Sequence, residues 1–236
     1  MNSSRLPGKM MLPLAGEHVI IHDIRRAMAS SVVDEVVVAT TFHPCDDIIA
    51  RFAERGGACV YRGGEDDVLG RIFNAAEQYN ADIVVRLTGD NPFVEPKLIS
   101  AAVRFVEDGA DYASNKIDRT WPIGVDAEAF TFESFEYVES VARGPQHREH
   151  VTPYYRQCDD EFEVKNIIAE QVYDGQTLQA GQELRMTLDE FHDYILCRRV
   201  YGEVDFTGII DVRQAIEHIL DHNLQLINEK VNQKTL

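Results

Sequence analysis

The first nine residues hold side chains of the types that bind a chain of phosphates. Residues 3–9 read SSRLPGK, with two hydroxyl groups, two cations and a Pro-Gly turn. Arg5 can grip phosphate oxygens with parallel N–H groups, and Lys9 can neutralise them as a point charge. Gly8 lets the backbone approach a phosphate closely. The residues expected to bind a nucleotide here are Ser3, Ser4, Arg5, Gly8 and Lys9. The alternative is an ordinary Pro-Gly turn, since the Walker pattern is absent.

Two aspartates that follow predicted strands are the candidate metal ligands. Asp90 lies in a TGDNP turn after an apolar strand, and Asp189 ends a short predicted strand that reads RMTLD. Ligands of open α/β sheets bind at the carboxyl ends of strands. Mg²⁺ takes one or two protein carboxylates together with phosphate oxygens, so we expect Asp90 and Asp189 to hold Mg²⁺. The structural alternatives are a turn capped by Asp90 and a capping box of Thr187 and Glu190.

Residues 63–71 (GGEDDVLGR) join a predicted strand to a predicted helix. The side chains that could hydrogen-bond a nucleobase there are Glu65, Asp66 and Arg71. The alternative is that the acids only start the helix, where its macrodipole stabilises negative charge.

Two further segments carry polar side chains. Residues 121–126 (WPIGVD) form a turn in which Asp126 can accept hydrogen bonds from hydroxyl groups, or the turn simply leads into a strand. Residues 146–150 (QHREH) offer a basic, polar edge to an anionic acceptor. Their two histidines do not indicate a metal site, which would need a third ligand and a stronger pattern.

The charge of the chain limits its partners. Its 236 residues include 23 Lys and Arg against 40 Asp and Glu, for a net charge of −17. This charge argues against nucleic acid or an anionic membrane as the main partner. No apolar run is long enough to span a membrane, no signal pattern opens the chain, and the four cysteines form no CxxC pair. We therefore expect a cytoplasmic protein with reduced thiols.

Strand and helix patterns alternate through the first half of the chain, which predicts right-handed crossovers and a doubly wound, mostly parallel α/β sheet. Strands are predicted at residues 35–40, 58–61, 82–88, 111–114, 127–132 and 162–168. Helices are predicted at residues 18–30, 46–55, 66–79, 96–106, 133–142, 149–157, 190–201 and 212–220. We expect a single domain over residues 1–236 with a lid-like insertion, for acceptor binding or dimerisation, at about residues 115–184.

Taken together, these segments resemble the cytidylyltransferase superfamily that includes CMP-KDO and CMP-sialic acid synthetases. The resemblance is closest to the branch of spore coat polysaccharide biosynthesis protein F and covers essentially the whole chain. It rests on the order and spacing of the segments SRLPGK, VAT, RGGEDDVLGR, RLTGDNP, REHVTPY and TLD.

The resemblance implies a nucleotide-diphospho-sugar transferase (GT-A-like) fold and CTP-dependent activation of an acidic sugar for surface polysaccharide synthesis. Arg5 and Lys9 match the family's triphosphate loop, and Asp90 and Asp189 match its two metal-holding aspartates. The positions that fall on its acceptor side are Asp126, Arg148 and His150. Related synthetases are often dimers, so a homodimer is expected by resemblance only.

Two departures from the family pattern bear on function. Family members carry a hydrophobic central strand and an Ala-Arg step before the loop, whereas Met1 falls where the loop begins. We therefore expect the fold to lack its first central strand, through a misassigned start or a truncated chain. Ile123 stands where the branch often has an acid, which leaves the acceptor open. The rival functions are a glycosyltransferase, which would want an Asp-x-Asp motif in place of Gly89-Asp90-Asn91, and a non-catalytic nucleotide-binding homologue.

Overall fold

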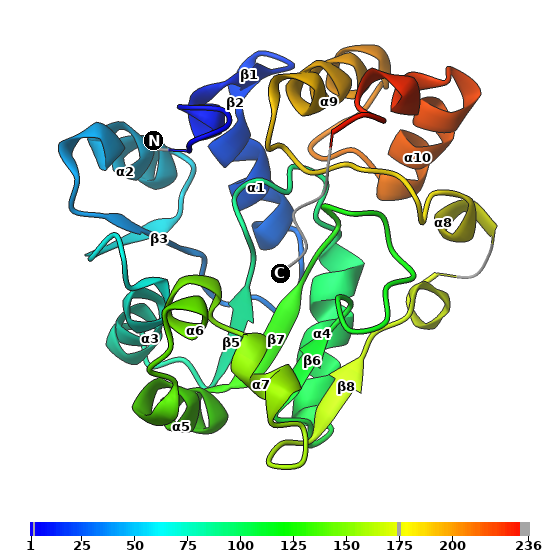
Figure 1. Ribbon diagram of the computed structural model, residues 1–236. Coiled ribbons are helices and arrows are strands. Elements are labelled where there is room, and N and C mark those ends of the chain that lie inside the picture. The colour runs from blue at the N-terminus through cyan, green and yellow to red at the C-terminus, as the bar shows by residue number, and fades with distance from the viewer. Residues whose placement is uncertain (2, 174–175, 232–236) are drawn as a thin grey trace.

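The structure, a computed structural model, describes residue 1, residues 3–173 and residues 176–231 (Figure 1). Its strands are β1 (Pro13–Leu14), β2 (Glu17–His18), β3 (Val37–Thr41), β4 (Cys59–Gly63), β5 (Ile83–Arg86), β6 (Tyr112–Ser114), β7 (Glu128–Thr131) and β8 (Val164–Asn166). Its α-helices are α1 (Val19–Met28), α2 (Asp47–Arg55), α3 (Val68–Gln78), α4 (Pro96–Glu107), α5 (Phe132–Val141), α6 (Pro145–His150), α7 (Pro153–Gln157), α8 (Gln176–Ala180), α9 (Phe191–Glu203) and α10 (Val212–Asp221). Its 3-10 helices are η1 (Lys9–Met11), η2 (Pro44–Asp46), η3 (Ala169–Gln171) and η4 (Leu224–Ile227).

The described strands form three separate sheets. β1 and β2 make an antiparallel hairpin, and β3 and β4 make a parallel pair. The main sheet has the order β5-β7-β6-β8. Within it, β7 runs antiparallel to both of its neighbours, while β6 pairs in parallel with β8. β5 and β6 therefore point the same way, and their carboxyl ends lie at the same edge of the sheet.

The alternating α/β organisation is confirmed, and β5, β6 and β8 of the main sheet run the same way, but β7 runs against them and departs from the expected doubly wound, mostly parallel sheet. Three of the five strand pairings are antiparallel: the β1–β2 hairpin and the two pairings of β7, which lies between β5 and β6. The sheet is also interrupted, because among the described strands β3 pairs only with β4 and β5 pairs only with β7. The absence of a first central strand stays a prediction.

The positions of most predicted elements are confirmed, with two local exceptions. The helix predicted at residues 149–157 is instead split into α6 and α7, since Val151 takes a positive φ of 73° and Pro153 cannot continue a helix. The strand predicted to end at Asp189 is reduced to one isolated parallel bridge between Ile123 and Arg185. Strands β7 and β8 both come from residues 115–184, so the predicted insertion contributes to the main sheet.

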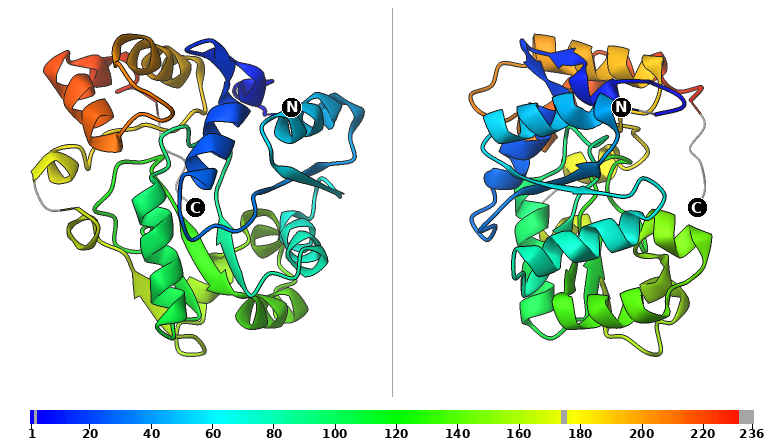
Figure 2. Two further views of the ribbon diagram at one scale, coloured as in Figure 1. Left: turned by 180° about the vertical axis from the view of Figure 1, so that it is seen from behind. Right: turned by 90° about the vertical axis from the view of Figure 1, so that its left-hand side faces the viewer.

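Apolar side chains project from both faces of the main sheet, because successive residues of a strand point to opposite faces. Ala113 and Ala129 belong to a buried cluster with α4, α9 and α10. Tyr112 and Phe130 face the other way, into a buried cluster with α3, α5 and α7. Figure 2 shows α4 on the face opposite α5, α6 and α7. A third cluster joins α1 to α2. Among the described residues, none of the helices is both long and apolar enough to cross a membrane.

Candidate active site

The N-terminal loop is closed by its own backbone. Gly8 has a φ of 72°, a conformation that glycine adopts without steric cost, and Lys9 begins η1 directly after it. The Leu6 N–H donates to the Ser3 hydroxyl at 3.4 Å, and the Lys9 N–H donates to the Leu6 carbonyl at 3.2 Å. The loop thereby presents Arg5 and Lys9 to the segment that precedes α9.

Lys9 brings the two predicted metal ligands together. Its ammonium lies 2.9 Å from Asp90 Oδ2 and 3.2 Å from Asp189 Oδ1. Arg5 adds a second cation, with its guanidinium 3.0 Å from Asp189 Oδ1 and 3.5 Å from Glu190 Oε1. Four residues chosen from the sequence as catalytic therefore lie in one cluster: Arg5, Lys9, Asp90 and Asp189.

Main-chain hydrogen bonds hold the two aspartate segments side by side. The Leu188 N–H donates to the Asp90 carbonyl at 2.7 Å, and the Thr187 hydroxyl donates to the same oxygen at 3.0 Å. Both donors come from the buried stretch that leads to Asp189. The backbone alone thus places Asp90 next to the segment of Asp189.

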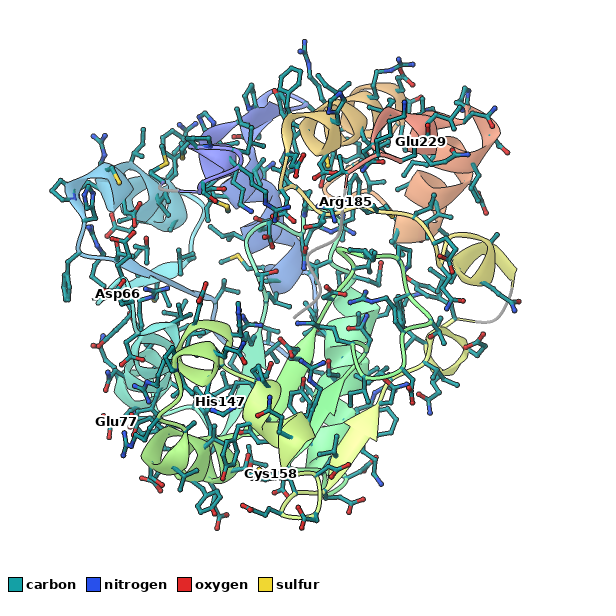
Figure 3. All side chains as sticks on the ribbon, in the orientation of Figure 1. Asp66, Glu77, His147, Cys158, Arg185 and Glu229 are labelled. Carbon is teal, nitrogen blue, oxygen red and sulfur yellow. The ribbon has the colours of Figure 1, made fainter. Side chains whose placement is uncertain are left out.

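A buried arginine contacts the carboxylate oxygen of Asp189 that Lys9 and Arg5 do not contact. The Arg185 guanidinium contacts Asp189 Oδ2 at 2.9 Å and the carboxylate of Asp193 at 3.0 Å. Asp193 is fully buried and accepts hydrogen bonds from the backbone N–H groups of Asp189 and Glu190. Figure 3 shows Arg185 on the stretch that leads into α9. Arg185 and Asp193 thereby fix the rotamer of Asp189 while leaving its other oxygen to the cluster.

The aspartate pair fits a magnesium ion in its donor chemistry. Both Asp90 and Asp189 approach one cation, Lys9, through a carboxylate oxygen, and such oxygens are the protein ligands that Mg²⁺ prefers. Burial alone would raise the pKa of Asp90, but the Lys9 ammonium and the Thr88 hydroxyl outweigh it and lower that pKa. Among the described residues there is no cluster of three or more His, Cys, Asp or Glu that could hold a metal. A pair of carboxylates needs phosphate oxygens or water to complete the shell.

The sequence analysis missed a further carboxyl group near this cluster, that of Asp23. Both oxygens of Asp23 are buried, and neither has a hydrogen-bond partner among the described residues. Burial, and then the charge of Asp90, raise the pKa of Asp23 well above its usual range. Its place within the apolar pattern of α1 concealed it, whereas Arg185 and Asp193 could have been recognised by their four-residue spacing from Asp189.

The predicted nucleotide-side residues lie apart from the aspartate pair. Glu65 and Asp66 are exposed, and Figure 3 shows Asp66 at the outer edge of the molecule, away from Arg185. Arg71 folds back on its own loop and donates to the Gly64 carbonyl at 2.6 Å. Asp67 caps α3 by accepting from the Gly70 N–H, which accounts for one acid of this stretch as a helix start.

Asp126 lies on a turn that packs against the Asp189 segment. The Ile123 N–H donates to the Leu184 carbonyl at 2.9 Å, and the Met186 N–H donates to the Ile123 carbonyl at 2.7 Å. Asp126 itself pairs with Arg119 at 2.6 Å. Whether the second carboxylate oxygen of Asp126 accepts a hydroxyl group of an acceptor stays a prediction.

Arg148, an acceptor-side residue in the sequence analysis, forms two ion pairs within the chain. Its guanidinium pairs with Asp67 at 2.5 Å and with Glu139 at 3.0 Å, so it ties α6 to the start of α3. His150 ends α6 two positions later and is half-buried. Whether Arg148 and His150 contact an acceptor stays a prediction.

Comparison with known proteins places these residues in a family. The family model described as Cytidylyltransferase matches residues 1–231. The spore coat polysaccharide biosynthesis protein SpsF of Bacillus subtilis is 30% identical, over 98% of this chain and 94% of that protein. The 3-deoxy-manno-octulosonate cytidylyltransferase of Anaeromyxobacter dehalogenans is 33% identical, over 64% of this chain and 68% of that protein. A cytidylyltransferase structure from Leptospira borgpetersenii matches with a TM-score of 0.87 and 29% identity, over 100% of this chain and 95% of that one.

Proposed function

The chain belongs to the cytidylyltransferase family, and we propose that it transfers CMP from CTP to a hydroxyl group of an acidic sugar, releasing pyrophosphate. The observation that carries this proposal is the convergence of Asp90 and Asp189 on Lys9, with Arg5 alongside. Two carboxylates and two cations at the carboxyl end of a strand are the groups that a metal-bound triphosphate requires.

The cations act on the phosphates. When CTP binds, the Lys9 ammonium contacts phosphate oxygens in place of the two carboxylates. The Arg5 guanidinium moves from Asp189 to the pyrophosphate that departs. Asp90 and Asp189 would hold Mg²⁺, which would supply positive charge to stabilise the reacting phosphates. Arg185 keeps Asp189 in place during this exchange, because its own contacts to Asp193 are buried and do not involve the ligand.

The acidic class of the acceptor is supported by the Anaeromyxobacter relative, whose name specifies an octulosonate. A role in surface polysaccharide synthesis is supported by the name of the Bacillus relative. A cytoplasmic location and a homodimer belong to the same proposal. A glycosyltransferase is disfavoured, because the turn after β5 carries Gly89-Asp90-Asn91 without an Asp-x-Asp pair.

The test is pyrophosphate release by the 236-residue chain with Mg²⁺, a panel of acidic sugars, and CTP, ATP, GTP or UTP. We expect release with CTP and at least one acidic sugar. Selective CTP binding with no release on any sugar would favour the non-catalytic homologue. Release with a different nucleotide would overturn the assignment of CTP.

A further inference from the structure

A second charged cluster lies in the main sheet, outside the aspartate pair. Its centre is Glu128, the first residue of β7, whose side chain is only 3% exposed. One carboxylate oxygen accepts from the Tyr112 hydroxyl at 2.6 Å and the Thr152 hydroxyl at 2.7 Å. The other accepts from Arg86 at 2.5 Å and lies 3.5 Å from the Lys116 ammonium. The Glu128 carboxylate is thus fully used.

The two cations of this cluster keep donors to spare. Arg86 has five N–H donors and Lys116 has three. Among the described residues, Glu128 is the acid that pairs with either side chain, and Arg86 donates one hydrogen bond. The side chains are 12% and 18% exposed. None of the nitrogen atoms of these two side chains is both fully buried and without a partner, so the nitrogen atoms that make no contact reach solvent.

The charge of the cluster suits one monovalent anion. Arg86 and Lys116 carry two positive charges, and Glu128 cancels one of them. Arg156 of α7 adds cationic field from the side of Tyr112. A single carboxylate would neutralise the excess and occupy the free donors of Arg86, whose planar fork matches its two oxygens.

The cluster is placed to receive an acceptor. Arg86 ends β5, and Lys116 follows β6 by two residues, so both lie at the edge of the sheet that Asp90 also follows. Asp90 follows Arg86 by four residues, so the Cα atoms of these two residues are at most about 14 Å apart. Tyr112 belongs to the buried cluster that includes α7, and Thr152 lies between α6 and α7 in the chain.

We propose that Arg86 and Lys116, held by Glu128, bind the carboxylate of the acidic acceptor sugar. This inference rests on the proposed function and adds the residues that select an acid over a neutral sugar. The triphosphate is not the occupant we infer, because Arg5 and Lys9 already face the aspartate pair that holds its metal. One net positive charge also matches a carboxylate better than a polyphosphate.

The test is titration calorimetry in the presence of Mg²⁺ and α,β-methylene-CTP, an analogue that cannot release pyrophosphate, so that binding is measured without reaction. The probes are 3-deoxy-manno-octulosonate, its neutral methyl ester, and pyruvate as a minimal carboxylate. The main variant is Lys116→Met, which keeps the apolar stem. Lys165→Met is the matched control, since Lys165 is exposed and pairs with Glu163. Arg86→Lys is a second variant that keeps a charge on Glu128 but removes the fork.

We expect wild type and Lys165→Met to bind the acid about tenfold or more tightly than the ester, and Lys116→Met to lose that preference. Arg86→Lys should weaken the binding of the acid and leave the binding of the ester unchanged. Full acid preference in Lys116→Met overturns the proposal, as does wild type that binds neither the acid nor pyruvate.

CTP binding is measured on the same samples. If CTP does not bind wild type, the proposed function fails. If CTP binds normally but the carboxylate preference is missing or insensitive to Lys116, only the Arg86–Lys116 site fails.

Discussion

The Leu188 N–H donates a hydrogen bond to the Asp90 carbonyl at 2.7 Å, and this contact joins the two chain segments that carry the acidic pair. The side-chain carboxylates of Asp90 and Asp189 lie 2.9 Å and 3.2 Å from the Lys9 ammonium. Backbone hydrogen bonds and ion pairs therefore both hold the two aspartate segments together.

Asp90→Asn should abolish most of the pyrophosphate release. An amide keeps the shape but removes the charge that binds Mg²⁺, and the loss of such a contact costs about a hundredfold or more in rate. Steady-state rates with CTP and an accepted sugar measure the loss. Asp108→Asn, an exposed residue after α4, is the control. A wild-type rate in Asp90→Asn would refute the metal role.

Arg185→Met should destabilise the fold as well as the site. The substitution leaves buried Asp193 and half-buried Asp189 without their shared cation, which costs about 3–5 kcal/mol of unfolding free energy. Urea denaturation measures this. Arg199→Met breaks an exposed pair with Glu203 and should cost about 0.5 kcal/mol or less. Equal losses in the two variants would contradict the supporting role of Arg185.

Gly124→Ala should disturb the turn that carries Asp126. Gly124 has a φ of 95°, and an added Cβ would lie 2.3 Å from the Thr187 nitrogen. Because both backbone strain and a backbone clash result, we expect a loss of about 3 kcal/mol or more. Gly208 also has a positive φ, of 80°, but a Cβ added there would meet no atom within 4 Å. Gly208→Ala should therefore cost about 1 kcal/mol of unfolding free energy. Thermal denaturation of both variants decides this, and matching midpoints would show that the close approach is unimportant.

The sequence predicted which residues cluster better than it predicted the topology that brings them together. Arg5, Lys9, Asp90 and Asp189 were recognisable because phosphate and magnesium restrict the side chains that can bind them. The antiparallel course of β7 was not, since apolar periodicity indicates that a strand exists and not which way it runs beside its neighbours.

Partnerships between distant residues were also hidden. Arg148 pairs with Asp67, and nothing in the sequence indicated this contact, because the two residues are 81 positions apart. Asp23 lay within a helical apolar pattern, and only packing shows that its carboxyl group is buried without a partner.

Glu128→Gln should show a pH-dependent loss of stability. Burial alone would raise the pKa of Glu128, but Lys116, Arg86 and the Tyr112 and Thr152 hydroxyls outweigh it and hold the pKa at about 2. An acid with a depressed pKa stabilises the fold above its unfolded pKa, here near 4.5, and loses that contribution as pH falls toward 2. The contribution is about 3 kcal/mol at pH 7.

Urea denaturation of wild type and Glu128→Gln at pH 7, 5, 4 and 3 tests this. The difference in unfolding free energy should be constant from pH 7 to about 5 and shrink below that. A difference that does not vary with pH would contradict the ionised, paired state of Glu128.

The central claim is that Asp90 and Asp189 form a magnesium-dependent CTP site with Arg5 and Lys9. The most direct measurement is the thermal denaturation midpoint with CTP, ATP, GTP or UTP, with and without Mg²⁺, for wild type and Asp189→Asn. The account predicts a rise in the wild-type midpoint that is selective for CTP, depends on Mg²⁺ and is lost in Asp189→Asn. An equal rise with all four nucleotides, no rise with any of them, or an unchanged response in Asp189→Asn would contradict it.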